Sequence, residues 1–167
     1  MYIRIAAIIF IILCGVFWGM NSSEKLRIRG DICSEIEKML RLCEYSIRVC
    51  DADVYGIITK LKASDYLLLA FLNELPENYD ENGDFHSKWR SAVLECQAFL
   101  PEERNLLLDV GNFLGTSDTE CQLRTLAVYQ ERAQELFKLR TTEYRVKGRL
   151  YRSLGLLAGV TVGIIAI

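Results

Sequence analysis

An unbroken run from Thr116 to Lys147 contains neither glycine nor proline, and it constrains the fold of this chain more than any other feature. Glycine and proline are the residues that most often interrupt helices, so a run of this length predicts one long helix. Gly115 stands directly before the run, and an apolar tail follows it from Ser153 to Ile167. We therefore predict a tight turn, a long helix and a membrane segment that continues the same helix.

The turn before the long helix can be predicted residue by residue. A helix expected to begin at Pro101 carries apolar residues at three- and four-residue spacing: Leu106, Leu107, Val110, Phe113 and Leu114. Gly115 can adopt the left-handed conformation that closes such a helix. Ser117 is then expected to cap the next helix, with Glu120 bonding back to the Ser117 N–H. Gly111, one turn earlier, indicates either close packing or a glycine tolerated in a fraying last turn.

The first half of the chain also has helical spacing. One packing seam is formed by residues at steps of three and four: Ile32, Ile36, Leu40, Cys43, Ile47 and Cys50. The seam predicts that Cys43 and Cys50 are small core residues and have no redox or metal role. Asp51 and Asp53 can end this helix and cap a short one over residues 54–62.

Two more helices are predicted between this short helix and Pro101. Ser64 is expected to cap a helix over residues 65–75, and Asp84 a helix that runs to about Phe99. A polar loop with proline, asparagine and glycine, residues 76–83, separates the two. Since no alternating pattern typical of strands occurs, the sequence predicts an all-α domain of about six helices.

Both ends of the chain have the composition of membrane anchors. Residues 5–23 carry no charge and would extend about 28 Å as a helix, close to the roughly 30 Å hydrocarbon core of a bilayer. A signal peptide is the alternative, but no small-x-small cleavage site follows the apolar run. We expect a transmembrane anchor at residues 1–23, a helical domain at residues 24–152 and a short C-terminal transmembrane segment at residues 153–167.

Basic residues flank both expected anchors on the side of the domain. Lys25, Arg27 and Arg29 follow the first anchor, and six residues precede or open the second: Lys138, Arg140, Arg145, Lys147, Arg149 and Arg152. The positive-inside tendency places the domain in the cytoplasm and both termini outside. Six cysteines without a paired spacing also favour a reducing compartment.

Glycines recur at four-residue spacing in both expected anchors. Gly155, Gly159 and Gly163 lie in the second, and Gly15 and Gly19 in the first. Small residues at this spacing let membrane helices approach closely. We predict that the two anchors pack as an antiparallel pair through these glycines.

The residue patterns of catalytic, cofactor and metal sites are missing from the sequence. His86 is the single histidine, and the two glycines Gly111 and Gly115 lack the lysine and hydroxyl residue of a phosphate loop. A net charge of −2 argues against nucleic-acid binding. The acidic stretch from Glu74 to Asp84 indicates a solvated loop or a docking patch for a basic partner. We expect no enzyme and no cofactor; a cysteine-based enzyme would need an exposed thiol of low pKa.

Two motifs occur in order in the second half of the chain. The first, G-x-x-L-G-x-x-D-x-x-x-Q, is carried by Gly111, Leu114, Gly115, Asp118 and Gln122. The second is Ser-Leu-Gly-Leu-Leu-Ala-Gly at residues 153–159. Together with Phe-His-Ser-Lys-Trp at residues 85–89 and the order of anchors and domain, they resemble the stage III sporulation protein AB family. The resemblance is sharpest over residues 101–167.

This resemblance implies a membrane component of the channel complex built between mother cell and forespore in spore-forming bacteria. The family looks related to the inner-membrane platform proteins of type II secretion and type IV pilus systems. Such proteins couple a cytoplasmic hexameric ATPase to the membrane apparatus. The implied partners are that ATPase and other membrane subunits in the mother-cell membrane, and homo-oligomerisation stays open. The alternative is a generic membrane-anchored helical scaffold or receptor for another partner.

Overall fold

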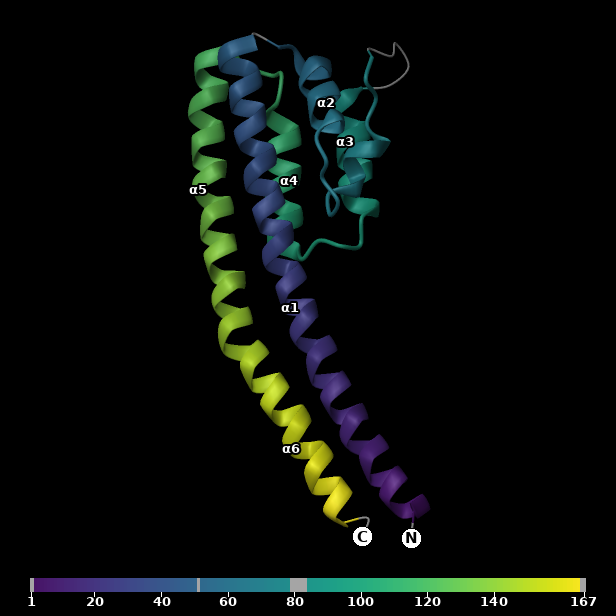
Figure 1. Ribbon diagram of the computed structural model, residues 1–167. Coiled ribbons are helices and arrows are strands. Elements are labelled where there is room, and N and C mark those ends of the chain that lie inside the picture. Colours follow the sequence, from purple (N-terminus) through teal and green to yellow (C-terminus); the bar gives the residue numbers. More distant parts are fainter. Residues whose placement is uncertain (1, 51, 79–83, 166–167) are drawn as a thin grey trace. The chain divides into compact units, whose positions relative to one another are not determined.

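The computed structural model describes residues 2–50, 52–78 and 84–165, and every regular element within these ranges is a helix (Figure 1). The predicted all-α fold is therefore confirmed.

The chain forms two compact units, which we describe separately. The two-helix unit comprises residues 1–30 and 138–167, and the bundle unit comprises residues 31–137. Helix α1 (Tyr2–Cys50) and helix α5 (Thr119–Glu143) contribute residues to both units.

The two ends of the chain are helical, as predicted, but their described residues do not meet the criteria for membrane-spanning helices. In the described part of the chain, no helix is both long enough and apolar enough to cross a membrane. The spanning helices predicted at residues 5–23 and 153–167 thus have no support from the structure. Part of each falls on side chains outside the described residues, namely those of residues 1–9, 11, 12, 158–160 and 162–167.

In the bundle unit, α1 buries the predicted seam. Five of its six members expose 5% of their surface or less: Ile32, Ile36, Leu40, Cys43 and Ile47. The prediction that Cys50 extends the seam is wrong, because Cys50 is exposed. It is the last residue of α1, and the chain turns back directly after it, where the Ala52 N–H donates to the Ser46 carbonyl oxygen at 3.2 Å.

Helix α2 (Val54–Ala63) confirms the predicted short helix and its cap. The Asp53 side chain accepts a hydrogen bond from the Gly56 N–H at 2.8 Å, which satisfies one of the free donors of the first turn. Asp51, the other predicted cap, lies outside the described residues. At the far end, the Ser64 hydroxyl donates to the Lys60 carbonyl oxygen at 3.0 Å.

The helix predicted over residues 65–75 is wrong. Ser64 ends α2 and does not open a new helix, so the chain continues irregularly as far as Leu69. The Leu68 N–H donates to Glu35 Oε2 of α1 at 2.9 Å, a bond that replaces helical pairing at this position. Only the short 3₁₀ helix η1 (Ala70–Glu74) follows.

Helix α3 (Phe85–Glu95) is shorter than predicted. It does not continue to Phe99, because the Arg104 guanidinium donates to the carbonyl oxygens of Cys96 and Phe99 at 3.3 and 3.4 Å. These bonds satisfy carbonyl groups that another helical turn would otherwise have used. Asp84 precedes the helix as predicted, but its side chain bonds no backbone N–H of the first turn.

Helix α4 (Pro101–Phe113) begins at the predicted proline, and Glu103 Oε2 accepts the Leu100 N–H at 2.9 Å. The predicted continuity of the last helix is also confirmed. Helix α5 passes into α6 (Arg149–Ile165) through η2 (Tyr144–Gly148), a wider π-helical turn that no residue pattern in the sequence indicates.

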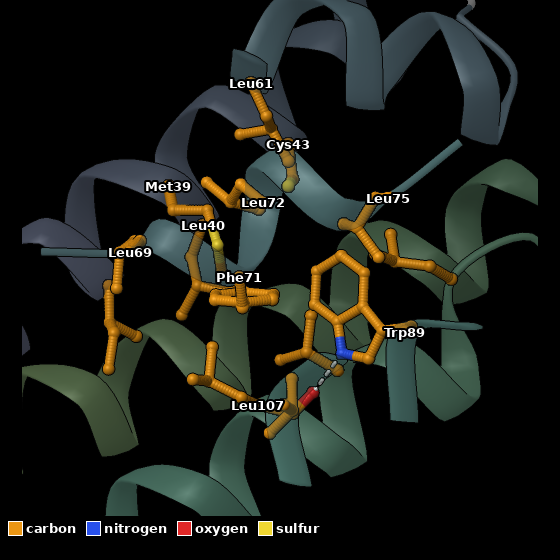
Figure 2. Packing of buried hydrophobic residues seen from close by; sticks show 14 of the residues in the cluster. Met39, Leu40, Cys43, Leu61, Leu69, Phe71, Leu72, Leu75, Trp89 and Leu107 are labelled. Atoms are coloured by element: carbon orange, nitrogen blue, oxygen red, sulfur yellow. Dashed lines mark hydrogen bonds between the residues drawn. The ribbon is translucent and has the colours of Figure 1, made fainter. Parts of the chain in front are cut away.

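Trp89 is the largest fully buried side chain in the core of the bundle unit (Figure 2). Its indole N–H donates to the Leu107 carbonyl oxygen at 2.7 Å, so the one polar atom of the ring is satisfied. The ring of Phe71 stands edge-on to Trp89 with 5.3 Å between centroids, and edge-on to Phe99 with 5.7 Å. Phe71 comes from η1, so this irregular segment fills the core without forming the predicted helix.

Helix α5 packs against α1 within the bundle unit. Leu126 and Ala133 of α5 are buried in the same core as the α1 seam. Gln130 Nε2 donates to Glu44 Oε2 at 2.8 Å and Gln134 Nε2 to Glu37 Oε1 at 3.2 Å. These contacts join positions about 90 residues apart in the sequence.

Candidate functional site

The turn between α4 and α5 carries the first motif, and Gly111 is its first residue. A Cβ atom at Gly111 would lie 2.0 Å from Cδ1 of Trp89, so the indole ring occupies that space. The Gly111 carbonyl oxygen lies 2.7 Å from Nδ1 of His86. Of the two interpretations left open for Gly111, the structure thus favours close packing.

Gly115 closes helix α4 in the predicted left-handed conformation, with φ +78°. Its absent side chain also leaves room for Val54, whose Cγ2 would lie 2.4 Å from a Cβ atom there. Leu114, the motif residue before it, is fully buried. The Thr116 N–H and hydroxyl both donate to the Phe113 carbonyl oxygen, at 3.2 and 2.8 Å.

Asp118 and Gln122 start helix α5. The Asp118 carboxylate accepts the Cys121 N–H at 3.2 Å, which makes Asp118 the cap of this helix. Gln122 Nε2 donates to the Ser117 carbonyl oxygen at 2.6 Å. The predicted capping box is therefore wrong: Ser117 lies one residue too early, and Glu120 pairs with Arg124 instead.

The whole first motif is explained by packing and capping contacts at the turn between α4 and α5. Each of its members fills a structural role: Gly111 against Trp89, Leu114 in the core, Gly115 at positive φ, Asp118 as a cap and Gln122 on the turn. The motif thus builds the connection between α4 and α5 and its packing against the rest of the bundle unit.

The second group of predicted residues lies in the two-helix unit. A Cβ atom at Gly155 would lie 2.5 Å from the Gly15 carbonyl oxygen and 3.0 Å from the Gly19 Cα. The backbones of α1 and α6 therefore touch at this level, as glycine-rich helix pairs do. Gly159 and Gly163 lie on α6, but their surroundings fall outside the described residues.

Small residues keep the same two helical segments close farther from the termini. A Cβ atom at Gly148 would lie 2.9 Å from the Ser23 hydroxyl oxygen, and one at Gly30 would lie 3.8 Å from the Thr141 hydroxyl oxygen. Together with Gly155, the contacts on the C-terminal segment recur every seven residues. A seven-residue repeat keeps one face turned toward a partner helix over several turns.

Large apolar side chains cover the outside of this pair. Eleven of them expose half of their surface or more: Phe10, Leu13, Phe17, Trp18, Met20, Leu139, Val146, Leu150, Leu154, Leu156 and Leu157. Six residues of α1 line a shallow apolar groove of about 470 Å³: Phe10, Leu13, Cys14, Val16, Phe17 and Met20. A continuous apolar surface of this kind is typical of contact with a membrane or another protein.

The described residues of the acidic stretch from Glu74 to Asp84 make ordinary surface contacts. Glu77 pairs with Lys62 at 3.3 Å, and Asp84 accepts a bond from the Ser87 hydroxyl at 3.3 Å. Asp80 and Glu81 lie outside the described residues. A shallow depression of about 460 Å³ beside it is lined by charges of both signs and small residues: Glu74, Asp84, Ser87, Lys88, Ser91, Ala92 and Glu95.

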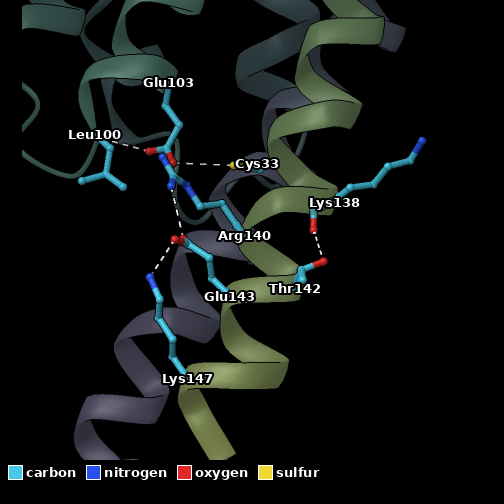
Figure 3. Close-up of polar contacts among 8 residues, drawn as sticks. All are labelled: Cys33, Leu100, Glu103, Lys138, Arg140, Thr142, Glu143 and Lys147. Carbon is cyan, nitrogen blue, oxygen red and sulfur yellow. Dashed lines mark hydrogen bonds and ion pairs between the residues drawn. The ribbon is translucent and has the colours of Figure 1, made fainter. Parts of the chain in front are cut away.

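The cysteines of the described part of the chain are free thiols in different surroundings. Cys43 is fully buried, and burial raises the pKa of its thiol to about 12. The Cys33 thiol donates to the buried Glu103 carboxylate at 3.7 Å (Figure 3). Cys50 and Cys121 are exposed. Within the described ranges, no three histidine, cysteine or acidic side chains are placed to hold a metal ion.

A cluster of charges joins the turns of the two-helix unit near η2 (Figure 3). Glu143 accepts from Lys147 at 3.0 Å and pairs with Arg140 at 3.3 Å. The hydrogen bond from Lys147 is the main reason why the pKa of Glu143 is lowered. A carboxylate held in this way stays ionised beside the two cations.

Comparison with known families settles the relationship of the chain. A family model described as stage III sporulation protein AB matches residues 4–167. The chain belongs to this family. The match covers both units, so the resemblance seen in the two motifs extends over the first half of the sequence as well. Neither a curated protein nor a solved structure matches the chain.

Proposed function

We propose that this member of the stage III sporulation protein AB family is a non-enzymatic platform in the mother-cell membrane. It holds a helical domain in the cytoplasm, where it couples a hexameric ATPase to the channel complex between mother cell and forespore. The family membership supports the role in sporulation. The single observation that carries the membrane attachment is the apolar outer surface of the two-helix unit.

The surfaces of the two units support a membrane-attached two-helix unit and a bundle unit in water. The two-helix unit presents large apolar side chains outward, while its two helices are held together by small residues. The bundle unit has a dense apolar core and a surface with exposed ion pairs, such as that of Glu120 with Arg124. Exposed i, i+4 pairs of this kind are typical of a helix face in water.

Membrane attachment is tested by introducing charges on the apolar surface. Leu154→Lys with Leu157→Lys should release the protein from membranes under alkaline extraction, because a lysine in the bilayer core is strongly unfavourable. Leu67→Lys with Leu94→Lys is the matched control, since these leucines are also exposed but belong to the bundle unit. Equal retention of both variants would refute attachment through the two-helix unit.

The ATPase contact is tested by photo-crosslinking in sporulating cells. Probes placed at the exposed positions Tyr45, Leu67, Leu94 and Val128 of the bundle unit should capture the ATPase of the complex. A probe at Phe17, which is equally exposed in the two-helix unit, should capture lipid or membrane subunits instead. Capture of an unrelated protein at all four bundle positions would favour the generic scaffold.

A further inference from the structure

Positive charge is concentrated beside the apolar surface of the two-helix unit. Residues 24–30 and 138–149 contain eight lysines and arginines but only two acidic residues, Glu24 and Glu143. The remainder of the chain has twelve basic and twenty acidic residues. The basic residues are therefore a local feature of this chain, whose net charge is −2.

Two contacts bring the basic segments to the same level of the helix pair. Ser23 meets Gly148 at one end, and Gly30 meets Thr141 at the other. Residues 24–29 of α1 must therefore run alongside residues 142–147. We call the basic side chains at this level, together with Arg149 directly beyond it, the collar: Lys25, Arg27, Arg29, Arg145, Lys147 and Arg149.

The collar surrounds the pair and does not lie along one side only. On α1 its members are two residues apart, so successive side chains point about 200° apart around an α-helix. Five of the six are exposed, and Arg29 is half-buried. Arg27 pairs with Glu24, and Lys147 with Glu143. Lys25, Arg145 and Arg149 make no ion pair within the described part of the chain and face solvent.

Most of the exposed apolar side chains of the unit lie on the terminal side of the collar, and Ile28 and Val146 lie within it. Trp18 and Met20 lie within two turns of Lys25, and Leu150 and Leu154 follow Arg149. A ring of cations at the edge of an apolar surface matches the boundary of a bilayer, where phosphate groups meet acyl chains. Indole rings also prefer this level of a membrane.

We propose that the collar binds the headgroups of anionic phospholipids and so fixes the depth of the helix pair in the membrane. This inference rests on the proposed membrane attachment. The ligand is a lipid phosphate whose acyl chains lie against the apolar surface. Free phosphate and acidic proteins share the charge but lack the chains. The interaction is electrostatic, so it should weaken as salt is added.

The test uses the full chain in a mild nonionic detergent. The protein is immobilised, equilibrated with mixed micelles of phosphatidylglycerol and phosphatidylcholine in equal amounts, and the retained lipids are quantified. We expect phosphatidylglycerol to be enriched several-fold at low salt and not at high salt. Lys25→Gln, Arg145→Gln and Arg149→Gln together should abolish most of this several-fold enrichment, because cations near a bilayer surface supply the attraction to anionic headgroups.

Controls separate this inference from the proposed attachment. Lys38→Gln, Arg90→Gln and Arg124→Gln remove three exposed charges from the bundle unit and should leave the enrichment unchanged. Inorganic phosphate or polyglutamate at equal ionic strength should not displace the lipid, and displacement by either would overturn the inference. Equal retention of the two lipids would also overturn it. If the protein fails to associate with neutral vesicles in flotation, the proposed attachment fails first.

Discussion

The indole ring of Trp89 lies against the bare backbone of Gly111, so close that a methyl group there would come within 2.0 Å of Cδ1. The ring cannot withdraw easily, because its N–H is bonded to the Leu107 carbonyl oxygen. The contact joins α3 to α4 in the centre of the bundle unit.

Gly111→Ala should therefore destabilise the bundle unit by about 1–3 kcal/mol, the usual cost of overpacking a core. Chemical unfolding of the full chain, followed by circular dichroism, measures the change. Gly30→Ala is the matched control, since a Cβ atom there meets only the Thr141 hydroxyl at 3.8 Å. Alanine favours helix by roughly 1 kcal/mol over glycine, so the control should be neutral or more stable. Similar effects of the two substitutions would contradict the packing described for Trp89.

Gly115→Ala should be unfavourable for two separable reasons. The left-handed backbone costs an alanine about 1–2 kcal/mol, and the new methyl group collides with Val54. Val54→Ala should remove the collision and leave the backbone cost. A double-mutant cycle on the free energy of unfolding then gives a positive coupling between the two sites. If the two effects are additive, Val54 does not limit the space at Gly115.

Ser23→Cys with Gly148→Cys should form a disulfide spontaneously in air. The Ser23 hydroxyl oxygen lies 2.9 Å from the Cβ position of residue 148, and a disulfide places these two atoms about 3 Å apart. Non-reducing electrophoresis after proteolysis between the helices detects the bond. The pair Met20→Cys with Gly148→Cys should not react, because Met20 is exposed. Adding Gly155→Leu should lower the yield of the first pair by separating α1 from α6.

Cys43 should make the stability of the bundle unit depend on alkaline pH. Its thiol has a pKa of about 12 in the folded chain, against an ordinary value of 9.0. The stabilisation is complete below pH 9 and is lost as pH rises toward 12, because only the unfolded chain loses this proton in that window. The expected slope is on the order of 1 kcal/mol per pH unit. Unfolding at pH 8, 9, 10 and 11 should show this extra slope in the natural chain and not in Cys43→Ala.

The regular helices could be predicted from the sequence where local signals and packing agree. The seam through Ile36 and Leu40 is buried as its spacing predicts, and Pro101 and Gly115 begin and end α4. These signals depend on residues at most one helical turn apart, so they can be recognised without knowledge of tertiary contacts.

Other features of the fold depend on tertiary contacts that cannot be recognised from residue spacing alone. Ser64 can cap either the helix before it or the helix after it, and the bond from Leu68 to Glu35 decides against a second helix. Asp118 and Ser117 are both good caps, and the choice depends on the turn geometry at Gly115. The contact of Trp89 with Gly111 crosses between two helices, so spacing within one helix could indicate close packing but could not identify the partner.

The pairing of α1 with α5 has a consequence for how the chain is made. Gln130 and Gln134 reach residues of α1 that leave the ribosome about 90 residues earlier. At roughly 5–20 residues per second, synthesis leaves that side of α1 uncovered for on the order of 5–20 s. During this interval the apolar seam can bind chaperones and other nascent chains. Substitutions that make the seam more hydrophobic would therefore lower the yield of folded protein, even where they leave the free energy of unfolding unchanged.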